Sequence, residues 1–377
     1  MKLHLVNDEK IINRTIDEFE EVFPGENLWV VTNRRKDFKL VKARTNVIGR
    51  DAFCKRHATA HYDEIYIHLL NPRKIKILSE IDTAGSRIYW IIWGLDLYNK
   101  LLVPKGFRLY RPGNSGRRRR IANLFKNLGQ KFEARQTARF ISRYVDFIVT
   151  DTTENDYNYL VQYYPEFSGK QWKDFFYYPI DSILNRELIS SAVCGTDIMI
   201  GNSASATNNH EYVLDILSRL DTRGRHIVVP LSYSGKKEYV KAIVTKGEKL
   251  FGRNFIPLLD FLPLEKYNRQ QRCASVALFG NLRQEAIGNI IIALYLGAKV
   301  FLIKSNPVYE WAISHGLSVG NLESMTQEEL DTPLGEYEKR HNREILTSLY
   351  TRDRMHRLIA ELSEQKNQKK TDNNLQV

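Results

Sequence analysis

Short apolar runs alternate with helical patterns along most of this 377-residue chain, and this alternation limits the folds open to it. It is most regular in the second half, where each apolar run of about five residues precedes a stretch with apolar residues at helical spacing. Strands separated by helices form parallel sheets covered by helices on both faces. We expect strands at 197–201, 226–230, 255–259, 275–279 and 299–303, and helices at about 208–220, 236–250, 263–272, 285–296 and 307–314.

The first half alternates less regularly, with strands expected at 2–6, 28–32, 64–68, 88–92 and 145–149 and helices at about 10–21, 72–80, 118–143 and 153–163. A chain of this length exceeds one ordinary core. The fold expected is therefore α/β, with two Rossmann-like domains facing a central cleft, where ligands bind at the carboxyl ends of the strands. The expected parts are an N-terminal domain 1–180, a C-terminal domain 195–335, a helix 336–362 and a disordered tail 363–377.

Targeting signals and cysteine pairs are not evident in the sequence. No apolar run reaches the roughly 20 residues needed to cross a bilayer, and the N-terminus lacks a signal-peptide core. Cys54, Cys194 and Cys273 are widely separated and form no metal-ligand pattern. We expect reduced thiols in a cytoplasmic protein.

The segment from Asp197 to Leu217 indicates a phosphate-binding turn. An apolar run, 198–200, ends in Gly201-Asn202-Ser203, and a loop of small polar residues leads through Asn209-His210 into a helical pattern. A strand, a tight turn and a helix start place backbone N–H groups and the positive end of a helix dipole over one point. The alternative is an ordinary turn between a strand and a helix in an α/β domain.

The net charge of +12 is concentrated in one segment, 105–143, which contains twelve lysines and arginines against the single acid Glu133. Arg117, Arg118, Arg119 and Arg120 precede apolar residues at helical spacing, and Phe125 and Lys126 lie within that stripe. Three interpretations remain open: contact with an anionic membrane surface, binding of nucleic acid, or a stripe that faces the core beneath solvated arginines.

Two residues in the first half are candidates for acid–base chemistry. Asp96 follows an apolar strand that ends in Trp93-Gly94, where a carboxylate can take a proton from a hydroxyl nucleophile. The alternative is a cap for the following helix. His68 ends another strand and has a suitable pKa, although a lone histidine is more often structural. His57 and His61 are four residues apart without a carboxylate partner, so no metal site is predicted.

In the second half, Tyr233 and the stretch from Arg283 to Asn289 follow further strands. Arg283 is suited to neutralising a pyrophosphate, and Gly288 to close backbone approach. The alternatives are a surface ion pair and a tight helix–sheet contact. No Asp-x-Asp motif occurs in the chain. A metal-bridged sugar transferase is therefore disfavoured, and arginine and helix dipoles would neutralise the leaving group.

Taken together, these motifs resemble one known family across most of the chain. The matching pieces are Asn13-Arg14-Thr15, His68 with Asn71-Pro72, the run from Trp90 to Tyr98, Tyr178-Pro179, Gly201-Asn202-Ser203 with Asn209-His210, Val228-Val229-Pro230 with Tyr233, Arg283-Gln284, Ile287-Gly288 and Asn306-Pro307. They resemble the TDP-N-acetylfucosamine:lipid II N-acetylfucosaminyltransferases of enterobacterial common antigen synthesis, glycosyltransferase family 56.

The resemblance implies a GT-B-like fold and a peripheral enzyme at the cytoplasmic face of the bacterial inner membrane. The donor would be a TDP-sugar and the acceptor an undecaprenyl-pyrophosphate-linked oligosaccharide, with no cofactor, no metal and no nucleic acid. Asp96 would be the first candidate for the general base, and His68 the second candidate. The residues that would hold the donor are Gly201, Asn202, Ser203, Asn209, His210, Tyr233, Arg283, Gln284, Gly288 and Asn306.

Departures from the family pattern leave the sugar open. Glu285-Ala286 stands where the family tends to have a Gln-Gly type pair, and Ile180-Asp181 where it tends to have Thr-Arg. Two other functions remain as alternatives: a nucleic-acid-associated protein that uses the 105–143 segment, and a GT-B-fold epimerase that acts on a nucleotide sugar without a lipid.

Overall fold

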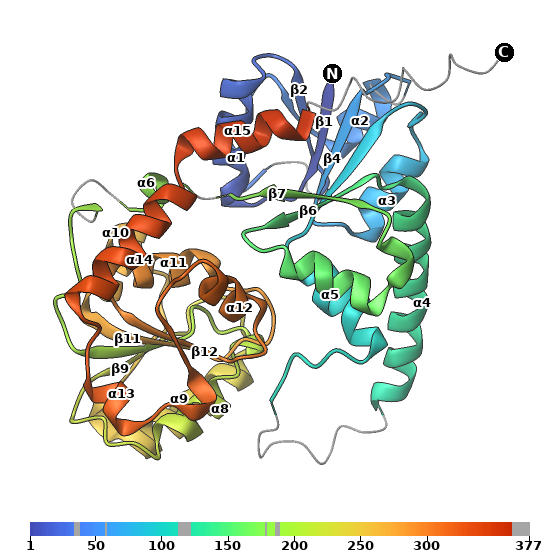
Figure 1. Cartoon of the computed structure of the whole chain (residues 1–377). Coiled ribbons are helices and arrows are strands. Elements are labelled where there is room, and N and C mark those ends of the chain that lie inside the picture. The colour runs from blue at the N-terminus through green and yellow to red at the C-terminus, as the bar shows by residue number, and fades with distance from the viewer. Residues whose placement is uncertain (34–37, 57–58, 112–121, 178, 185–188, 364–377) are drawn as a thin grey trace. The chain divides into compact units, whose positions relative to one another are not determined.

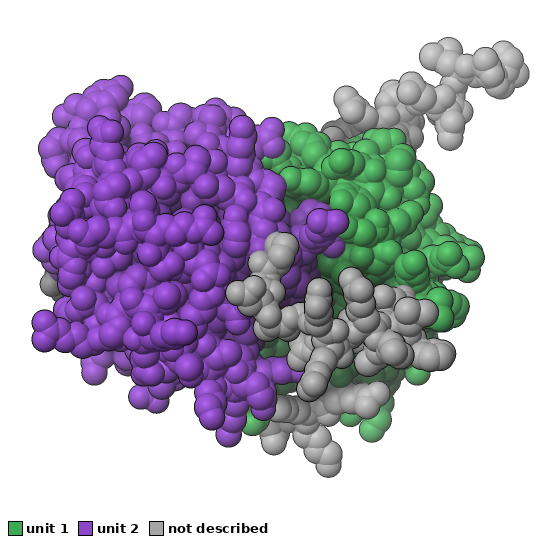
Figure 2. Space-filling model, turned by 90° about the horizontal axis from the view of Figure 1, so that it is seen from below, with its two compact units in different colours: residues 1–106, 124–177, 352–377 green, residues 107–123, 178–351 purple. Residues whose placement is uncertain are grey.

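The computed structural model describes residues 1–33, 38–56, 59–111, 122–177, 179–184 and 189–363. The chain forms two compact units, each built on one parallel sheet with helices on both faces (Figure 1). Unit 1 comprises residues 1–106, 124–177 and 352–377, and unit 2 comprises 107–123 and 178–351; Figure 2 shows them in different colours.

Unit 1 contains a seven-stranded sheet in the order β3-β2-β1-β4-β5-β6-β7. The strands are β1 (Lys2–Val6), β2 (Asn27–Val31), β3 (Val47–Gly49), β4 (Glu64–His68), β5 (Arg87–Ile91), β6 (Phe147–Asp151) and β7 (Gln171–Phe175). The helices are α1 (Lys10–Val22), α2 (Arg50–Arg56), α3 (Pro72–Ser79), the π-helix η1 (Leu95–Leu102), η2 (Val103–Lys105), α4 (Ala122–Tyr144), α5 (Asn155–Tyr163), η3 (Pro165–Phe167) and α15 (Arg352–Ser363).

Unit 2 contains a six-stranded sheet in the order β10-β9-β8-β11-β12-β13. The strands are β8 (Asp197–Ile200), β9 (Ile227–Pro230), β10 (Phe255–Leu258), β11 (Ala274–Phe279), β12 (Lys299–Leu302) and β13 (Val319–Asn321). The helices are α6 (Ile180–Ile183), η4 (Ala206–Asn208), α8 (His210–Leu217), α9 (Lys237–Phe251), η5 (Gly252–Asn254), α10 (Leu264–Cys273), α11 (Ile287–Leu296), α12 (Pro307–Ser314), η6 (Leu322–Ser324), α13 (Gln327–Asp331) and α14 (Glu336–Leu349).

Both sheets have the strand order of the Rossmann fold, in which the first strand of the unit is central and the chain then reverses direction across the sheet. The reversal lies between β1 and β4 in unit 1 and between β8 and β11 in unit 2. Loops that leave these paired strands diverge to opposite faces of the sheet. Each unit therefore has one preferred position for a ligand, at the carboxyl ends of those strands.

A ladder of stacked rings crosses the unit 1 sheet. Trp29, His4, Tyr66, Tyr89 and Phe147 lie in register on five adjacent strands, and their ring centroids are 3.8, 4.7, 4.7 and 4.6 Å apart in that order. Aromatic pairs at these separations contribute beyond the area that they bury. The ladder fixes the register of five strands, and with it the loops at their carboxyl ends.

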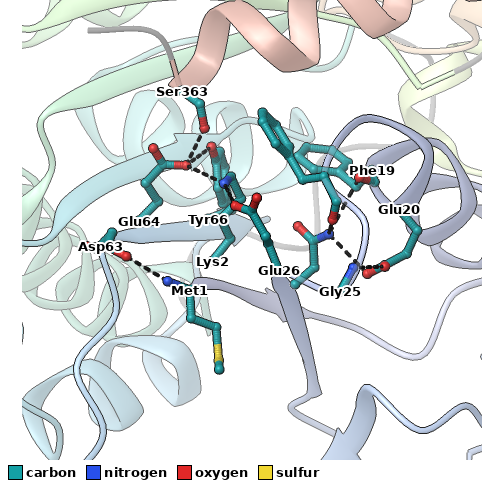
Figure 3. Close-up of polar contacts among 12 residues, drawn as sticks. Met1, Lys2, Phe19, Glu20, Gly25, Glu26, Asp63, Glu64, Tyr66 and Ser363 are labelled. Carbon is teal, nitrogen blue, oxygen red and sulfur yellow. Dashed lines mark hydrogen bonds and ion pairs between the residues drawn. The ribbon is translucent and has the colours of Figure 1, made fainter. Parts of the chain in front are cut away.

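The helix α15 returns to unit 1 and is fixed at the amino-end edge of its sheet. The Ser363 hydroxyl donates to Glu64 Oε2 over 2.6 Å, and the Tyr66 hydroxyl donates to the same oxygen over 2.8 Å (Figure 3). The Tyr89 hydroxyl donates to the Leu362 carbonyl over 2.6 Å. Glu64 is 3% exposed, and its charge is balanced by the partly buried Arg87.

Three details of the predicted organisation are wrong. The expected helix 336–362 is two helices, α14 and α15, because the chain leaves helical geometry at Tyr350. The second of these belongs to unit 1. Residues 107–123 belong to unit 2 rather than to the N-terminal part. Asn209 of unit 2 donates a hydrogen bond to the Leu109 carbonyl and accepts one from the Arg111 backbone N–H. The tail after Ser363 lies outside the described residues.

Candidate functional site

The carboxyl ends of β8 and β11 bring the two loops of the predicted donor site together in unit 2. The strands are neighbours in the sheet, and Gly201 N donates to the Leu278 carbonyl over 2.9 Å as β8 ends. The loop after β8 leads into α8, and the loop after β11 leads into α11. Two helices therefore begin beside the point where the topology places a ligand.

Gly201 is required by the geometry of this turn. Its φ is +66°, a left-handed conformation that glycine adopts without cost. A Cβ at this position would lie 2.6 Å from Asn208 Oδ1 and 3.0 Å from His210 Nε2. The loop therefore folds back on its own first residue and places the His210 imidazole directly beside it.

His210 has a buried ring nitrogen at this turn that has no hydrogen-bond partner among the described residues. Its side chain is buried, and Nδ1 lies 2.9 Å from the Tyr239 hydroxyl. A neutral imidazole has one N–H and one acceptor nitrogen, so the ring proton is on Nε2 when the Tyr239 hydroxyl donates to Nδ1. Burial lowers the pKa of His210 to about 3. Nε2 has no hydrogen-bond partner among the described residues and faces Gly201. A phosphate oxygen bound beside Gly201 would supply the missing partner.

Asn209 and Asn306 are scaffolding residues rather than exposed ligands. Asn209 Nδ2 donates to the carbonyls of Gly280 (2.7 Å) and Leu109 (3.2 Å), and Oδ1 accepts from Arg111 N over 3.0 Å. Asn306 caps α12, accepting from its backbone, and Nδ2 donates to the Asn281 carbonyl over 3.0 Å. Their predicted place in the donor site stays a prediction, and the geometry assigns them to holding its loops.

One carboxylate oxygen connects the two loops. Glu285 Oε2 accepts from Thr207 Oγ1 over 2.5 Å, from Asn281 Nδ2 over 2.9 Å and from Arg283 Nε over 3.1 Å. Thr207 follows β8, and Asn281 and Arg283 follow β11. Neither Glu285 nor Thr207 was among the predicted site residues. The ion pair expected as the alternative for Arg283 is present, but it is largely buried and lies at the switch point of the sheet.

The remaining predicted donor residues lie at the same edge. Tyr233 is 45% exposed, and its hydroxyl accepts from Asn202 Nδ2 over 3.5 Å. Ser203 and Gln284 are buried. Gly288 lies in the first turn of α11, and a Cβ there would meet nothing within 4 Å. Tight helix–sheet packing therefore does not require this glycine.

Backbone strain accumulates in these loops. Asn209, Ser234 and Ala286 have φ of 50°, 65° and 64°, and they follow β8, β9 and β11 respectively. L-residues adopt this conformation at a cost of about 1 kcal/mol. Strain of this kind persists where the surrounding structure imposes it, and it concentrates at ligand sites.

In unit 1, Asp96 is a fully engaged buried carboxylate. Oδ2 accepts from Leu70 N (2.8 Å) and Trp90 Nε1 (2.7 Å), and Oδ1 accepts from Trp93 N (3.0 Å) and Leu97 N (3.2 Å). Burial raises the pKa of Asp96, and these hydrogen bonds oppose the shift. Its role as general base stays a prediction. The geometry favours a structural role, in which the carboxylate fixes the loops after β4 and β5. This role differs from the helix cap expected as the alternative, because Gly94 is the N-cap residue of η1.

His68 lies within a chain of hydrogen bonds that crosses unit 1. Nδ1 lies 2.7 Å from the Tyr177 hydroxyl, which accepts from Trp93 Nε1 over 2.6 Å. Nε2 lies 3.3 Å from His4 Nδ1, and His4 Nε2 lies 3.2 Å from Asn27 Oδ1. The sequence pattern gave no indication of this chain, because its members lie on five separate segments.

The two ends of that chain fix its direction. The Trp93 indole can only donate, and the Asn27 oxygen can only accept from His4 Nε2. Because burial keeps both imidazoles neutral, His68 Nε2 donates to His4 Nδ1 and the Tyr177 hydroxyl donates to His68 Nδ1. Both imidazoles then carry their proton on Nε2. Burial lowers the pKa of His4 to about 3 and holds that of His68 well below its ordinary value. His68 as a base stays a prediction, and its engaged ring favours the structural alternative.

A buried lysine beneath the same loop also went unrecognised in the sequence. Lys74 on α3 is fully buried, and its ammonium donates to the carbonyls of His68 and Leu69. Burial lowers the pKa of Lys74 to about 7, and the charge of Asp96 opposes this shift. Leu69 has φ +62°, so Lys74 and Asp96 together hold a strained turn at the carboxyl end of β4.

Comparison with known proteins identifies the class of enzyme. The family model described as 4-alpha-L-fucosyltransferase, glycosyl transferase group 56, matches residues 139–332, just over half of the chain. The chain belongs to this glycosyltransferase family. The resemblance noted in the sequence is confirmed, and the protein is a glycosyltransferase.

Solved structures with the same two-unit fold cover nearly all of this glycosyltransferase. Anabaena HepE, solved in complex with UDP-glucose, is 13% identical in sequence and superposes with a TM-score of 0.63. The match covers 96% of this chain and 98% of the HepE chain. Sucrose-phosphate synthase from Thermosynechococcus elongatus is 10% identical with a TM-score of 0.64, covering 96% and 97%. At these identities the likeness concerns the fold, and it confirms two Rossmann-like α/β units of the GT-B type.

The basic segment of the glycosyltransferase is described in part. Arg117 to Arg120 and the side chains of Phe125 and Lys126 lie outside the described residues. Further along α4, Leu128 and Phe132 are 62% and 63% exposed, whereas Ala134, Ala138 and Ile141 on another face are buried. The interpretation that the stripe faces the core is therefore wrong for Leu128 and Phe132.

None of the helices described is both long enough and apolar enough to span a bilayer. Glu18, Glu21 and His356 lie close enough to share an ion, but Arg352 already pairs with Glu18 over 2.9 Å. The expected independence from metal stays a prediction.

Proposed function

We propose that this glycosyltransferase moves a deoxy-amino sugar of the N-acetylfucosamine type from a TDP-sugar to a polyprenyl-pyrophosphate-linked oligosaccharide. The acceptor would belong to a bacterial surface polysaccharide. The observation that carries the donor side is the buried Nε2 of His210, which lies beside Gly201 at the switch point of the unit 2 sheet and has no partner among the described residues. A diphosphate is the donor group that fits an unpartnered N–H between two helix starts.

Several groups in unit 2 would bind the donor. The N–H of His210 would donate to a phosphate oxygen, and the guanidinium of Arg283 would offset charge on the leaving diphosphate. Tyr233 is exposed at the same edge and offers a ring against which a base or sugar would pack. The family description as a fucosyltransferase supports a deoxy sugar, and HepE supports a nucleoside diphosphate carrier.

In unit 1, we propose that the carboxyl ends of β4 and β5 receive the acceptor. Asp96 and His68 would shape this surface. Asp96 accepts from the backbone N–H of Trp93, and the Tyr177 hydroxyl, which contacts His68 Nδ1, accepts from the Trp93 indole. Trp93 is half-buried, and an aromatic face of this kind suits the apolar side of a sugar ring.

Nucleotide binding tests the donor assignment. The purified protein is heated with TDP, UDP, GDP or CMP, one at a time and without metal. A ligand that binds only the folded state at 100 times its Kd stabilises it by about 2.7 kcal/mol. TDP is expected to raise Tm more than the others. If none of the four raises Tm, the donor site proposed for unit 2 is wrong.

We also propose that α4 brings the enzyme to the cytoplasmic face of the inner membrane. Leu128 and Phe132 are exposed one helical turn apart, and Lys131, Arg135 and Arg139 are exposed along the same stretch. Apolar side chains enter the acyl boundary while basic ones contact anionic headgroups. Such a surface would hold the enzyme at the membrane, where a lipid-linked acceptor is located.

Replacing Leu128 and Phe132 together with serine is expected to weaken binding to phosphatidylglycerol-containing vesicles by tenfold or more, because each buried side chain contributes about 1.5–3 kcal/mol. Sedimentation with the vesicles measures it. The matched control is Ile313→Ser, which removes an apolar side chain that is 51% exposed on α12. Equal vesicle binding by the double variant and the control would show that α4 does not contact the membrane.

A further inference from the structure

The acid Glu285 occupies the position in unit 2 where an anionic ligand is expected. Its Oε2 takes three donors, from Thr207, Asn281 and Arg283. These donors come from the two loops that flank the switch point, the same loops that the proposed function assigns to the diphosphate. In this structure the donors are satisfied by an anion that the protein itself supplies.

The surroundings of Glu285 favour negative charge for two independent reasons. The helix α11 begins two residues later, and the partial positive charge of its N-terminus favours an anion there. The side chains of Glu285 and Arg283 are only 15% and 11% exposed, so their charges interact with little screening. Nε2 of His210 and the oxygens Oδ1 of Asn202 and Asn281 are also buried without a hydrogen-bond partner among the described residues. The two oxygens can only accept, so they suit the hydroxyl or amide groups of a ligand and not its anionic oxygens. The site is thus built to hold a polar ligand that is larger than one carboxylate.

A fixed carboxylate at such a site treats substrate and product differently. In a nucleotide-sugar donor each phosphate carries one negative charge. When the sugar leaves, the bond between its anomeric carbon and the phosphate oxygen breaks, and the electron pair stays on the diphosphate. The terminal phosphate then has a second ionisation near pH 6, so the free nucleoside diphosphate carries about one more negative charge at neutral pH.

We propose that Glu285 is a specificity-determining residue that repels the nucleoside diphosphate product more strongly than the nucleotide-sugar donor. This inference rests on the proposed function, because it requires a diphosphate at the same loops. The carboxylate either remains beside the ligand or gives up its three donors to it, and in both cases tight binding of the product is opposed. Glu285 would therefore favour release of the product once the sugar has been transferred.

The variant Glu285→Gln tests this inference, because the amide keeps an acceptor for the three donors and removes the charge. Calorimetric titration with TDP and with TDP-glucose gives the two affinities. TDP is expected to bind about tenfold more tightly to the variant, and TDP-glucose about threefold or less, as one unit charge at short range changes affinity on the order of tenfold. Glu248→Gln removes the same charge from an exposed position on α9 and should change neither affinity.

The outcomes separate this inference from the proposed function. If wild-type protein binds TDP but the variant binds it equally well or more weakly, Glu285 does not oppose the product and the inference is wrong. If the substitution increases the affinities for TDP and TDP-glucose by the same factor, Glu285 does not discriminate between them and the inference is wrong. If wild-type protein binds neither ligand, the proposed donor site is itself wrong. Circular dichroism of the variant shows whether it retains the native fold.

Discussion

Replacing Asp96 with asparagine is expected to lower the free energy of unfolding of unit 1 by about 3 kcal/mol. Each carboxylate oxygen of Asp96 accepts two hydrogen bonds. An asparagine offers one oxygen and one NH2 group, so in either orientation two buried N–H donors face another donor. The loss should appear as a lower urea midpoint, followed by tryptophan fluorescence, because four of the five tryptophans lie in unit 1.

The control for this substitution is Asp63→Asn. Asp63 is half-exposed and pairs with the N-terminal ammonium group over 2.6 Å, and pairs of this kind contribute at most about 1 kcal/mol. The two roles considered for Asp96 predict different results. If Asp96→Asn unfolds at the wild-type urea concentration yet loses sugar transfer, the carboxylate acts in the chemistry and our structural assignment fails.

The variant Gly288→Ala is expected to weaken TDP binding by tenfold or more while leaving the protein at least as stable as the wild type. A Cβ at Gly288 meets no atom within 4 Å, so the methyl group itself costs nothing in the free protein. Alanine in place of glycine within a helix gains about 0.5–1 kcal/mol. The open space beside the first turn of α11 is where we place the diphosphate, and the methyl group would occupy it.

Gly129→Ala is the matched control, because Gly129 also lies in a helix with no atom within 4 Å of an added Cβ. It should gain similar stability and bind TDP as the wild type does. Titration calorimetry measures the affinities, and thermal unfolding measures the stability. Unchanged TDP affinity in Gly288→Ala would mean that the diphosphate does not approach the start of α11.

The sequence predicted the central strands of both sheets because they are apolar and buried, and each is followed by a clear helical period. It missed β3, β7 and β13, which are edge strands. β3 and β13 have only three residues each, and β7 carries polar residues along most of its length. Short and partly polar strands are common at sheet edges because they discourage pairing with other chains. The apolar pattern that marks a central strand is therefore absent from them.

The sequence indicated where the candidate donor residues lie in the fold but not which residues they contact, and their role in binding the donor stays a prediction. The motifs placed Gly201, His210, Arg283 and Gly288 after the correct strands, since the carboxyl ends of parallel strands meet at one edge. The partners of these residues come from other loops, as Thr207 does for Glu285. The same limit applies to His68, whose hydrogen-bond partners His4 and Tyr177 lie 64 and 109 residues away in the sequence.

Hydrogen–deuterium exchange with and without saturating TDP tests most directly the claim that unit 2 holds the donor diphosphate. Ligand contacts slow the local opening that exposes amides to exchange. We predict slower exchange in peptides that cover residues 201–211 and 280–289, and unchanged exchange in β1 and β4 of unit 1. Protection confined to unit 1, or no protection at 201–211 and 280–289 under conditions where TDP is bound, would contradict the account.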